Sequence, residues 1–262
     1  MKVLFLGDIF GEPGRVAIKN HLKDIVSEIH PDFVIANGEN AAHGAGITYD
    51  MAMDLFSYGI DVLTGGNHTF DKKAIWDRMQ EIPNLLRPAN FPHGVPGKGS
   101  IIVSKSGLKL AVLNLQGRIE MSPIDSPFAV AERIIPEIRK ETQYILVDFH
   151  AEATSEKEAL GYYLDGKVSA VCGTHTHVPT ADERVLANGT AYITDVGMCG
   201  VEDSIIGLDK DIALKRFTTM IPWPFKPAEG DVTLNYVVIE IGESGRATSV
   251  KRGSFRESFN GK

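Results

Sequence analysis

Five polar residues stand where the strands of the predicted fold end, and their types suit metal binding. They are two carboxylates, one amide and two imidazoles: Asp8, Glu39, Asn67, His150 and His175. Each lies at, or within a few residues of, the carboxyl end of a predicted strand, and ligands bind at that edge of an open α/β sheet. Four of the five have a glycine nearby, which lets the backbone turn sharply beside a metal or phosphate. These side chains are therefore expected to converge in one crevice.

A second histidine extends this set. His175 and His177 are two residues apart, so on an extended segment both side chains point to the same side and can serve adjacent metals. The carboxylate of Glu39 could bridge those ions. Mixed oxygen and imidazole ligands suit Mn, Fe or Zn better than Ca or Mg, and the absence of paired cysteines excludes a structural cysteine-zinc site.

Each of these residues has an ordinary structural explanation when it is taken alone. An isolated Asp8 after a strand is more often a turn or helix-cap residue, and His150 alone would be a hydrogen-bonded, partly buried histidine. The pattern His-x-His also occurs in ordinary strands. Their joint placement at strand ends is what favours a metal site.

The elements that must position these side chains alternate between strand and helix in the first third of the chain. Apolar runs at residues 2–7, 33–37 and 61–64 predict strands. Helical periodicity follows each run and predicts helices at about 16–29, 48–58 and 71–81. This order is typical of parallel strands joined by helices.

The remainder of the chain contains sequence signals for both parallel and antiparallel strands. A hairpin is predicted at 100–104 and 109–115, followed by a helix at about 127–141. Strands are expected at 144–149 and 168–172, separated by a helix that opens at a capping box, 155–158, and runs to about 165. Two antiparallel pairs complete the prediction, 185–187 with 191–194 and 233–241 with 247–255.

The segment at 222–227 contains three prolines and cannot be a central strand, because proline has no backbone donor. Its aromatic residues could cover a ligand. A surface loop or a contact between subunits is the alternative, and the sequence leaves the choice open.

The composition fits one large α/β domain, residues 1–262. Hydrophobic residues make up 43% and charged residues 23%, so a core can form without disulfides. The net charge of −7 disfavours partners such as duplex nucleic acid or an anionic membrane, and no apolar run approaches the roughly 20 residues of a membrane span. The start lacks signal-peptide features, and Cys172 and Cys199 are expected to be buried thiols, so a cytoplasmic location is predicted.

Taken in order, the motifs Asp, Gly-Glu-Asn, Gly-Asn-His, His and Gly-Thr-His-Thr-His resemble the calcineurin-like metallophosphoesterases. They are most similar to the bacterial YmdB-like branch of cyclic-nucleotide phosphodiesterases. The resemblance runs from Met1 through the C-terminal strands and includes LFLGDIFGEPGR, NGENAAHGAGIT, GGNHTFD, DFHAEATSEK and GTHTHVPTAD. It implies a four-layer α-β-β-α sandwich, with helices flanking two mixed central sheets.

The resemblance also implies a role for each site residue. Asp8 and His177 would bind one metal and Glu39 would bridge, whereas the second metal would be bound by Asn67, His150 and His175. The general acid would be His68. The family implies two iron or manganese ions, and 2′,3′- or 3′,5′-cyclic nucleotides as substrates.

Three departures from the wider superfamily affect this assignment. The usual Asp-x-His opening lacks its histidine here, and Asn40 is expected to fill that place as a metal ligand. Glu39 replaces the common bridging aspartate and is one methylene longer. Thr69 stands where an acid normally follows the catalytic histidine, so Asp71 could orient His68 instead.

The expected reaction is attack of a metal-bridging hydroxide on a cyclic nucleotide or short phosphodiester, with His68 protonating the leaving group. Two alternatives stay open. A phosphomonoesterase or nucleotidase would use the same metals and differ in the walls of its pocket. A metal-binding regulatory protein would act without turnover. The sequence leaves the oligomeric state, including a homo-oligomer, undecided.

Overall fold

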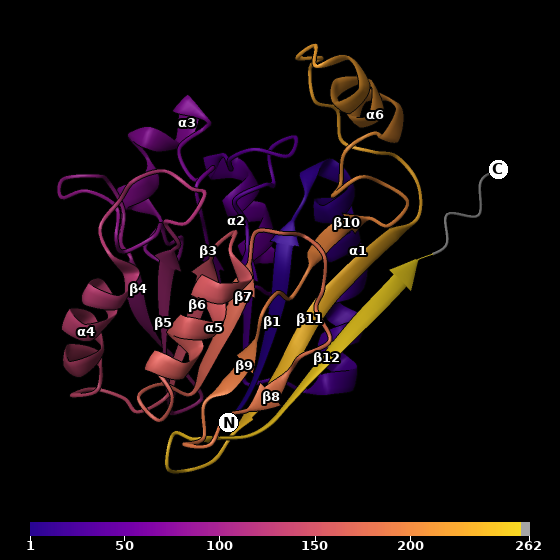
Figure 1. Cartoon of the computed structure of the whole chain (residues 1–262). Coiled ribbons are helices and arrows are strands. Elements are labelled where there is room, and N and C mark those ends of the chain that lie inside the picture. The colour runs from indigo at the N-terminus through magenta and orange to yellow at the C-terminus, as the bar shows by residue number, and fades with distance from the viewer. Residues whose placement is uncertain (258–262) are drawn as a thin grey trace.

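The computed structural model describes residues 1–257, whose strands form two six-stranded mixed sheets (Figure 1). The first sheet has the order β12-β11-β10-β1-β2-β3, with the bounds β1 (Lys2–Ile9), β2 (Phe33–Asn37), β3 (Val62–Thr64), β10 (Met198–Val201), β11 (Val232–Ile241) and β12 (Ala247–Glu257). The second has the order β4-β5-β6-β7-β9-β8, with the bounds β4 (Ser100–Lys105), β5 (Leu108–Gln116), β6 (Ile145–His150), β7 (Ala170–Thr174), β8 (Arg184–Val185) and β9 (Ala191–Ile193).

The strands that lead to the predicted site residues are parallel within each sheet. In the first sheet, β10, β1, β2 and β3 run in one direction, β11 runs antiparallel to them, and β12 runs antiparallel to β11. In the second, β5, β6, β7 and β9 share a direction. The carboxyl ends of both parallel sets lie at the same edge of the molecule, the upper edge in Figure 1.

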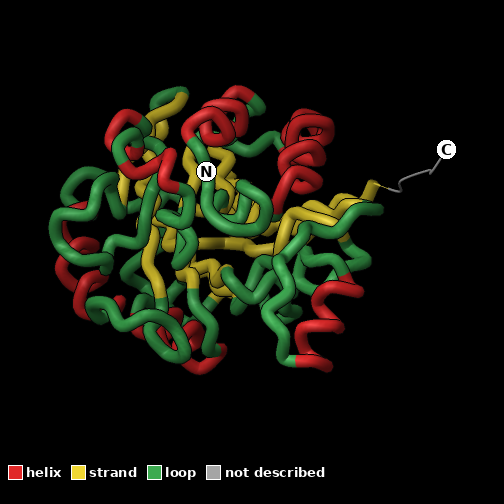
Figure 2. Tube along the Cα trace, turned by 90° about the horizontal axis from the view of Figure 1, so that it is seen from above, coloured by secondary structure: helices red, strands yellow, loops and turns green. Residues whose placement is uncertain are grey.

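Helices cover the outer faces of the two sheets, as the view from above shows (Figure 2). The two helices that pack on the first sheet are α1 (Gly11–Ile29) and α2 (Tyr49–Ser57). Those that pack on the second are α4 (Pro127–Ile138) and α5 (Thr154–Tyr163). Three shorter or peripheral helices complete the described chain: α3 (Lys73–Trp76), the 3₁₀ helix η1 (Met79–Glu81) and α6 (Lys210–Thr219).

Side chains alternate between the two faces of each strand, and the buried apolar ones form three separate layers. On β1, Leu4 packs toward the helices and Val3 packs toward the second sheet. On β5, Val112 faces the first sheet, and Leu113 packs with residues of α4 and α5. Successive side chains of a strand point to opposite faces, so the central strands of each sheet are buried on both sides. The predicted four-layer sandwich of two mixed sheets is confirmed.

Several predicted boundaries are wrong. The helix expected at 71–81 is divided into α3 and η1, because Ile75 and Met79 reach the core while the chain turns between them. The strand expected at 168–172 is β7, which extends to Thr174 because that residue pairs with His150. The capping box is absent: α5 starts one residue earlier, without a side-chain cap, and Glu158 pairs with Arg184 instead.

Two elements were not predicted from the sequence. Strand β10 is four residues long and buried throughout, so it shows no alternation of polar and apolar residues. Helix α6 buries only Ala213, so it has no buried apolar stripe, and it stands away from the sandwich in Figure 1. Next to it, residues 221–227 form the expected irregular segment, in which Trp223 and Phe225 are exposed.

Two sequence expectations about the rest of the chain can be compared with the structure. No helix within residues 1–257 is long and apolar enough to cross a membrane. Cys172 and Cys199 are buried and unpaired, as expected, and burial raises the pKa of both thiols.

Candidate metal centre

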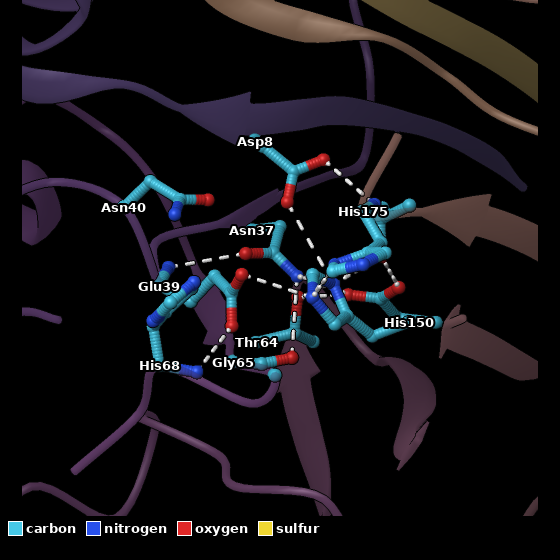
Figure 3. A network of polar contacts seen from close by, with 12 residues as sticks. Asp8, Asn37, Glu39, Asn40, Thr64, Gly65, His68, His150 and His175 are labelled. Atoms are coloured by element: carbon cyan, nitrogen blue, oxygen red, sulfur yellow. Dashed lines mark hydrogen bonds and ion pairs between the residues drawn. The ribbon is translucent and has the colours of Figure 1, made fainter. Parts of the chain in front are cut away.

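The structure brings side chains from both sheets together at the shared carboxyl edge (Figure 3). The contacts centre on Nε2 of His150, the last residue of β6. This atom lies 2.9 Å from Oε1 of Glu39, 3.1 Å from Oδ1 of Asn67 and 3.0 Å from Nδ1 of His175. Glu39 and Asn67 follow β2 and β3 of the first sheet, and His175 follows β7 of the second. The predicted convergence of these residues is therefore observed.

The remaining predicted ligands lie beside this cluster. Asp8 is fully buried near the end of β1, with Oδ1 3.7 Å from Nδ1 of His150 and Oδ2 accepting a hydrogen bond from the backbone N–H of His175 at 3.2 Å. Oδ1 of Asn40 lies 3.3 Å from Nε2 of His177. Asn40 thus stands beside the second histidine, and its substitution for the missing histidine of the opening motif stays a prediction.

The donor set of this centre fits a cation. Glu39, His150 and His175 each offer one ligand atom, and these atoms lie within 4.8 Å of one another. Oδ1 of Asp8 is buried and has no hydrogen-bond partner within residues 1–257, and its nearest ion-pair contact is Nδ1 of His150 at 3.7 Å. Buried carboxylate oxygens without donors are costly, and a bound metal ion would satisfy them.

Two histidines have one nitrogen fixed by a protein acceptor. Nδ1 of His150 lies 2.9 Å from Oγ1 of Thr174, and that hydroxyl donates to Oδ1 of Asp148 at 2.7 Å. Nδ1 of His177 lies 2.8 Å from the carbonyl oxygen of Ile206. In both rings the acceptor favours a proton on Nδ1, which leaves Nε2 turned toward the cluster.

A polar layer beneath the cluster was missed in the sequence. Asp148 is fully buried and accepts hydrogen bonds from the side chains of Asn37, Thr64 and Thr174. Oδ1 of Asn37 in turn accepts from the backbone N–H of Glu39 at 3.1 Å. The available signal was the presence of polar residues inside otherwise apolar strands, because buried polar groups need partners.

The segment that carries His175 and His177 is not extended, so the argument from two-residue spacing is wrong. Both residues have left-handed backbones, with φ of 100° and 67°, because the chain leaves β7 at Thr174. Oδ2 of Asp195 accepts from the backbone N–H and the hydroxyl of Thr176 between them, at 3.1 and 2.7 Å. Lys157, also buried, donates to the same oxygen at 2.7 Å. A buried ion pair therefore anchors the turn.

The charges of the protein shift the pKa values of the cluster in opposite directions. Burial raises the pKa of Glu39, but the nearby His150 outweighs it and lowers the value to about 2. Burial alone would lower the pKa of His150, but Glu39, Asp8 and Asp148 raise it to about 9. Burial, together with other carboxylates, holds the pKa of Asp8 well above its usual value. The site is thus built to hold positive charge.

His68 lies at the rim of this centre. Its backbone N–H donates to Oε2 of Glu39 at 3.0 Å, and its Nδ1 lies 2.7 Å from Oδ2 of Asp71. The suggested contact between Asp71 and His68 is therefore present. Gly66 is required next to them, since a Cβ there would lie 2.2 Å from Cδ2 of His150 and 2.3 Å from Oε2 of Glu39.

Comparison with known proteins identifies the family. A model of the family described as YmdB-like protein matches residues 4–252. This chain belongs to the YmdB-like family. The resemblance drawn from the sequence motifs is confirmed, and the match includes every residue proposed for the site.

Relatives of this YmdB-like chain align over nearly its whole length. A Bacillus subtilis (strain 168) protein named 2′,3′-cyclic-nucleotide 2′-phosphodiesterase is 53% identical over 253 residues, 96% of each chain. A crystal structure of a hypothetical protein from Thermus thermophilus matches with a TM-score of 0.92 and 44% identity, over 98% of this chain and 100% of the other. A structure from Mycoplasma pneumoniae, described as a novel phosphatase, has a TM-score of 0.92 and 34% identity, over 98% and 94%.

Proposed function

We propose that this YmdB-like chain is a metal-dependent phosphodiesterase that hydrolyses cyclic nucleotides. The observation that carries the proposal is the convergence of Glu39, Asn67 and His175 on one nitrogen of His150, next to the buried carboxylate of Asp8. The name of the Bacillus subtilis relative supports 2′,3′-cyclic nucleotides as the substrate class. A 3′,5′-cyclic nucleotide is the related substrate to compare.

The proposed metal ligands are the residues gathered at the sheet edge: Asp8, Glu39, Asn40, Asn67, His150, His175 and His177. Imidazole nitrogens combined with carboxylate and amide oxygens suit iron or manganese. Two such ions, when bound, would polarise the phosphoryl group and lower the pKa of a water that attacks phosphorus. The polar layer of Asn37, Thr174 and Asp148 would hold the ligands in place.

The proposed general acid is His68. Its Nδ1 is engaged by Asp71, so Nε2 is the nitrogen that can transfer a proton. As the new bond from oxygen to phosphorus forms, one bond from phosphorus to a ribose oxygen breaks, and His68 donates its proton to that leaving oxygen. The product is a nucleoside monophosphate, formed with the consumption of one water.

The test is a substrate panel assayed with purified protein and added Mn²⁺. We expect turnover of 2′,3′-cyclic AMP, loss of that turnover when a chelator is added, and its recovery when Mn²⁺ is returned. The product separates by chromatography as the 2′- or 3′-monophosphate, and the relative's name leads us to expect 3′-AMP. Turnover of AMP without turnover of either cyclic nucleotide would reject the proposal.

A phosphomonoesterase is the second candidate, and the description of the Mycoplasma pneumoniae structure favours it. Both activities would use the same ligands, so the metal centre does not separate them. The ratio of kcat/KM for 2′,3′-cyclic AMP to that for 3′-AMP separates the two functions. We expect this ratio to exceed one.

A further inference from the structure

His175 differs from the other two histidines of the centre in the nitrogen that it presents. His150 and His177 each turn Nδ1 toward a protein acceptor and Nε2 toward the cluster. In His175 the arrangement is reversed, since Nδ1 lies 3.0 Å from Nε2 of His150. Its Nε2 lies 3.0 Å from Oε2 of Glu152. The carboxylate of Glu152 is therefore the protein acceptor for this ring.

The register between β6 and β7 brings Glu152 to this position. His150 is paired with Thr174, so the residues that follow each strand leave the sheet side by side. Glu152 lies two residues beyond His150, and His175 lies one residue beyond Thr174. The side chain of Glu152 is 45% exposed and that of His175 is 20% exposed, so their contact lies at the rim.

Few other contacts fix the orientation of the His175 ring. Its backbone is in the left-handed region, outside the hydrogen-bond ladder of β7. Its backbone N–H is bound by Asp8, which holds the main chain and not the ring. Histidines that bind metals commonly donate their other N–H to a carboxylate or carbonyl, which fixes the tautomer and the direction of the ring.

We propose that Glu152 is a positioning residue that keeps a proton on Nε2 of His175 and thereby directs the lone pair of Nδ1 toward the metal. The inference rests on the proposed function only in assuming that His175 binds a metal. Glu152 would act through His175, without contact to substrate. The centre would thus have one ligand whose alignment is set at the exposed rim.

The experiment compares metal binding in three variants freed of metal with a chelator. Glu152→Ala removes the acceptor, and Glu152→Gln retains a neutral one. Glu158→Ala is the matched control, because Glu158 lies on α5, is 44% exposed, and pairs with Arg184 away from the centre. Calorimetric titration with Mn²⁺ alone should show affinity about 10- to 100-fold weaker for Glu152→Ala. Glu152→Gln should be intermediate, and Glu158→Ala should match wild type.

A second measurement records the tautomer directly. Long-range ¹H–¹⁵N spectra of histidine-labelled, metal-free protein should show the His175 ring, assigned with His175→Ala, with its proton on Nε2 in wild type. Glu152→Ala should show a mixture of tautomers. Equal Mn²⁺ affinity and an unchanged tautomer in Glu152→Ala would overturn the proposal, as would an equal loss of affinity in Glu158→Ala.

These measurements use no nucleotide, so they separate this proposal from the proposed function. If the chain hydrolyses no cyclic nucleotide but Glu152→Ala weakens Mn²⁺ binding, only the assigned activity fails. If cyclic nucleotides are hydrolysed and Glu152→Ala binds Mn²⁺ normally, only the role of Glu152 fails.

Discussion

The floor and the rim of the site differ in what holds their residues in place. Asp8, Glu39 and His150 have side chains that are no more than 1% exposed, whereas those of His68 and Asp71 are 37% and 45% exposed. The floor is fixed by two sheets and a buried polar layer, and the proposed acid is fixed by one local carboxylate. Changes in the floor should therefore affect metal binding, and changes at His68 or Asp71 should affect proton transfer alone.

The largest effect is expected for Asp8→Ala, which removes a proposed ligand from the floor. Metal content should fall, and hydrolysis of 2′,3′-cyclic AMP should drop by about 10⁴-fold, because a metal ion at the phosphoryl group contributes several kcal/mol to the barrier. Elemental analysis and steady-state kinetics measure both quantities. Full metal content with full activity would show that Asp8 is not a ligand.

His68→Ala removes the proposed general acid and should separate proton transfer from metal binding. Hydrolysis should fall by about 10³-fold, within the usual range for a general acid, while metal content stays at the wild-type level. The loss should be smaller for a p-nitrophenyl phosphodiester, whose leaving group needs less protonation. His93→Ala changes an exposed loop histidine and should have no effect. Equal losses for both esters would contradict the assigned acid role.

The pH dependence of metal binding reports on the floor. The protein charges raise the pKa of His150 from 6.5 to about 9, so at pH 7 the ring must lose a proton before it can bind a metal. Affinity for Mn²⁺ should rise with pH by up to about tenfold per unit and level off above about pH 9. Calorimetry in buffers of different ionisation enthalpy counts the protons released. Constant affinity from pH 6.5 to 8.5 would contradict this pKa.

The smallest effect is expected for Asp71→Asn, which alters the orientation of the acid without removing it. Hydrolysis should fall by roughly tenfold, less than in His68→Ala, because the imidazole remains. The double variant with both Asp71→Asn and His68→Ala should be no slower than His68→Ala, since Asp71 acts through the ring of His68. Additive losses in this kinetic cycle would show that Asp71 acts independently of His68.

The sequence predicted the floor of the site better than the structure around it. Glu39, Asn67 and His150 could be placed because strand ends are visible as apolar runs followed by polar residues. Asp148 lies inside such a run and Thr174 ends strand β7, and their partners come from other strands, so the hydrogen bonds between them have no local signal. The left-handed turn of His175 and His177 was missed because Asp195, which anchors it, is 19 residues beyond Thr176 in the chain.

The elements of the fold, too, were predicted only where the sequence carries a local signal. Most strands and helices were predicted from periodicity, and the four layers followed from the family resemblance. Strand β10 and helix α6 do not alternate between buried and exposed residues. Strand β10 is buried throughout, and helix α6 is almost entirely exposed. We infer that residues 1–257 form one domain, because two sheets share the central apolar layer. A single thermal transition would support this inference.

The interior position of β1 has a consequence for synthesis on the ribosome. The first strand made pairs with β2 on one side, but its other partners are β10 and β11, which begin at Met198 and Val232. Until those residues emerge, the nascent chain exposes an unpaired apolar strand edge, which is a template for aggregation. Fragments that stop before Val232 should therefore be recovered mainly as insoluble material, whereas the full chain stays in the supernatant.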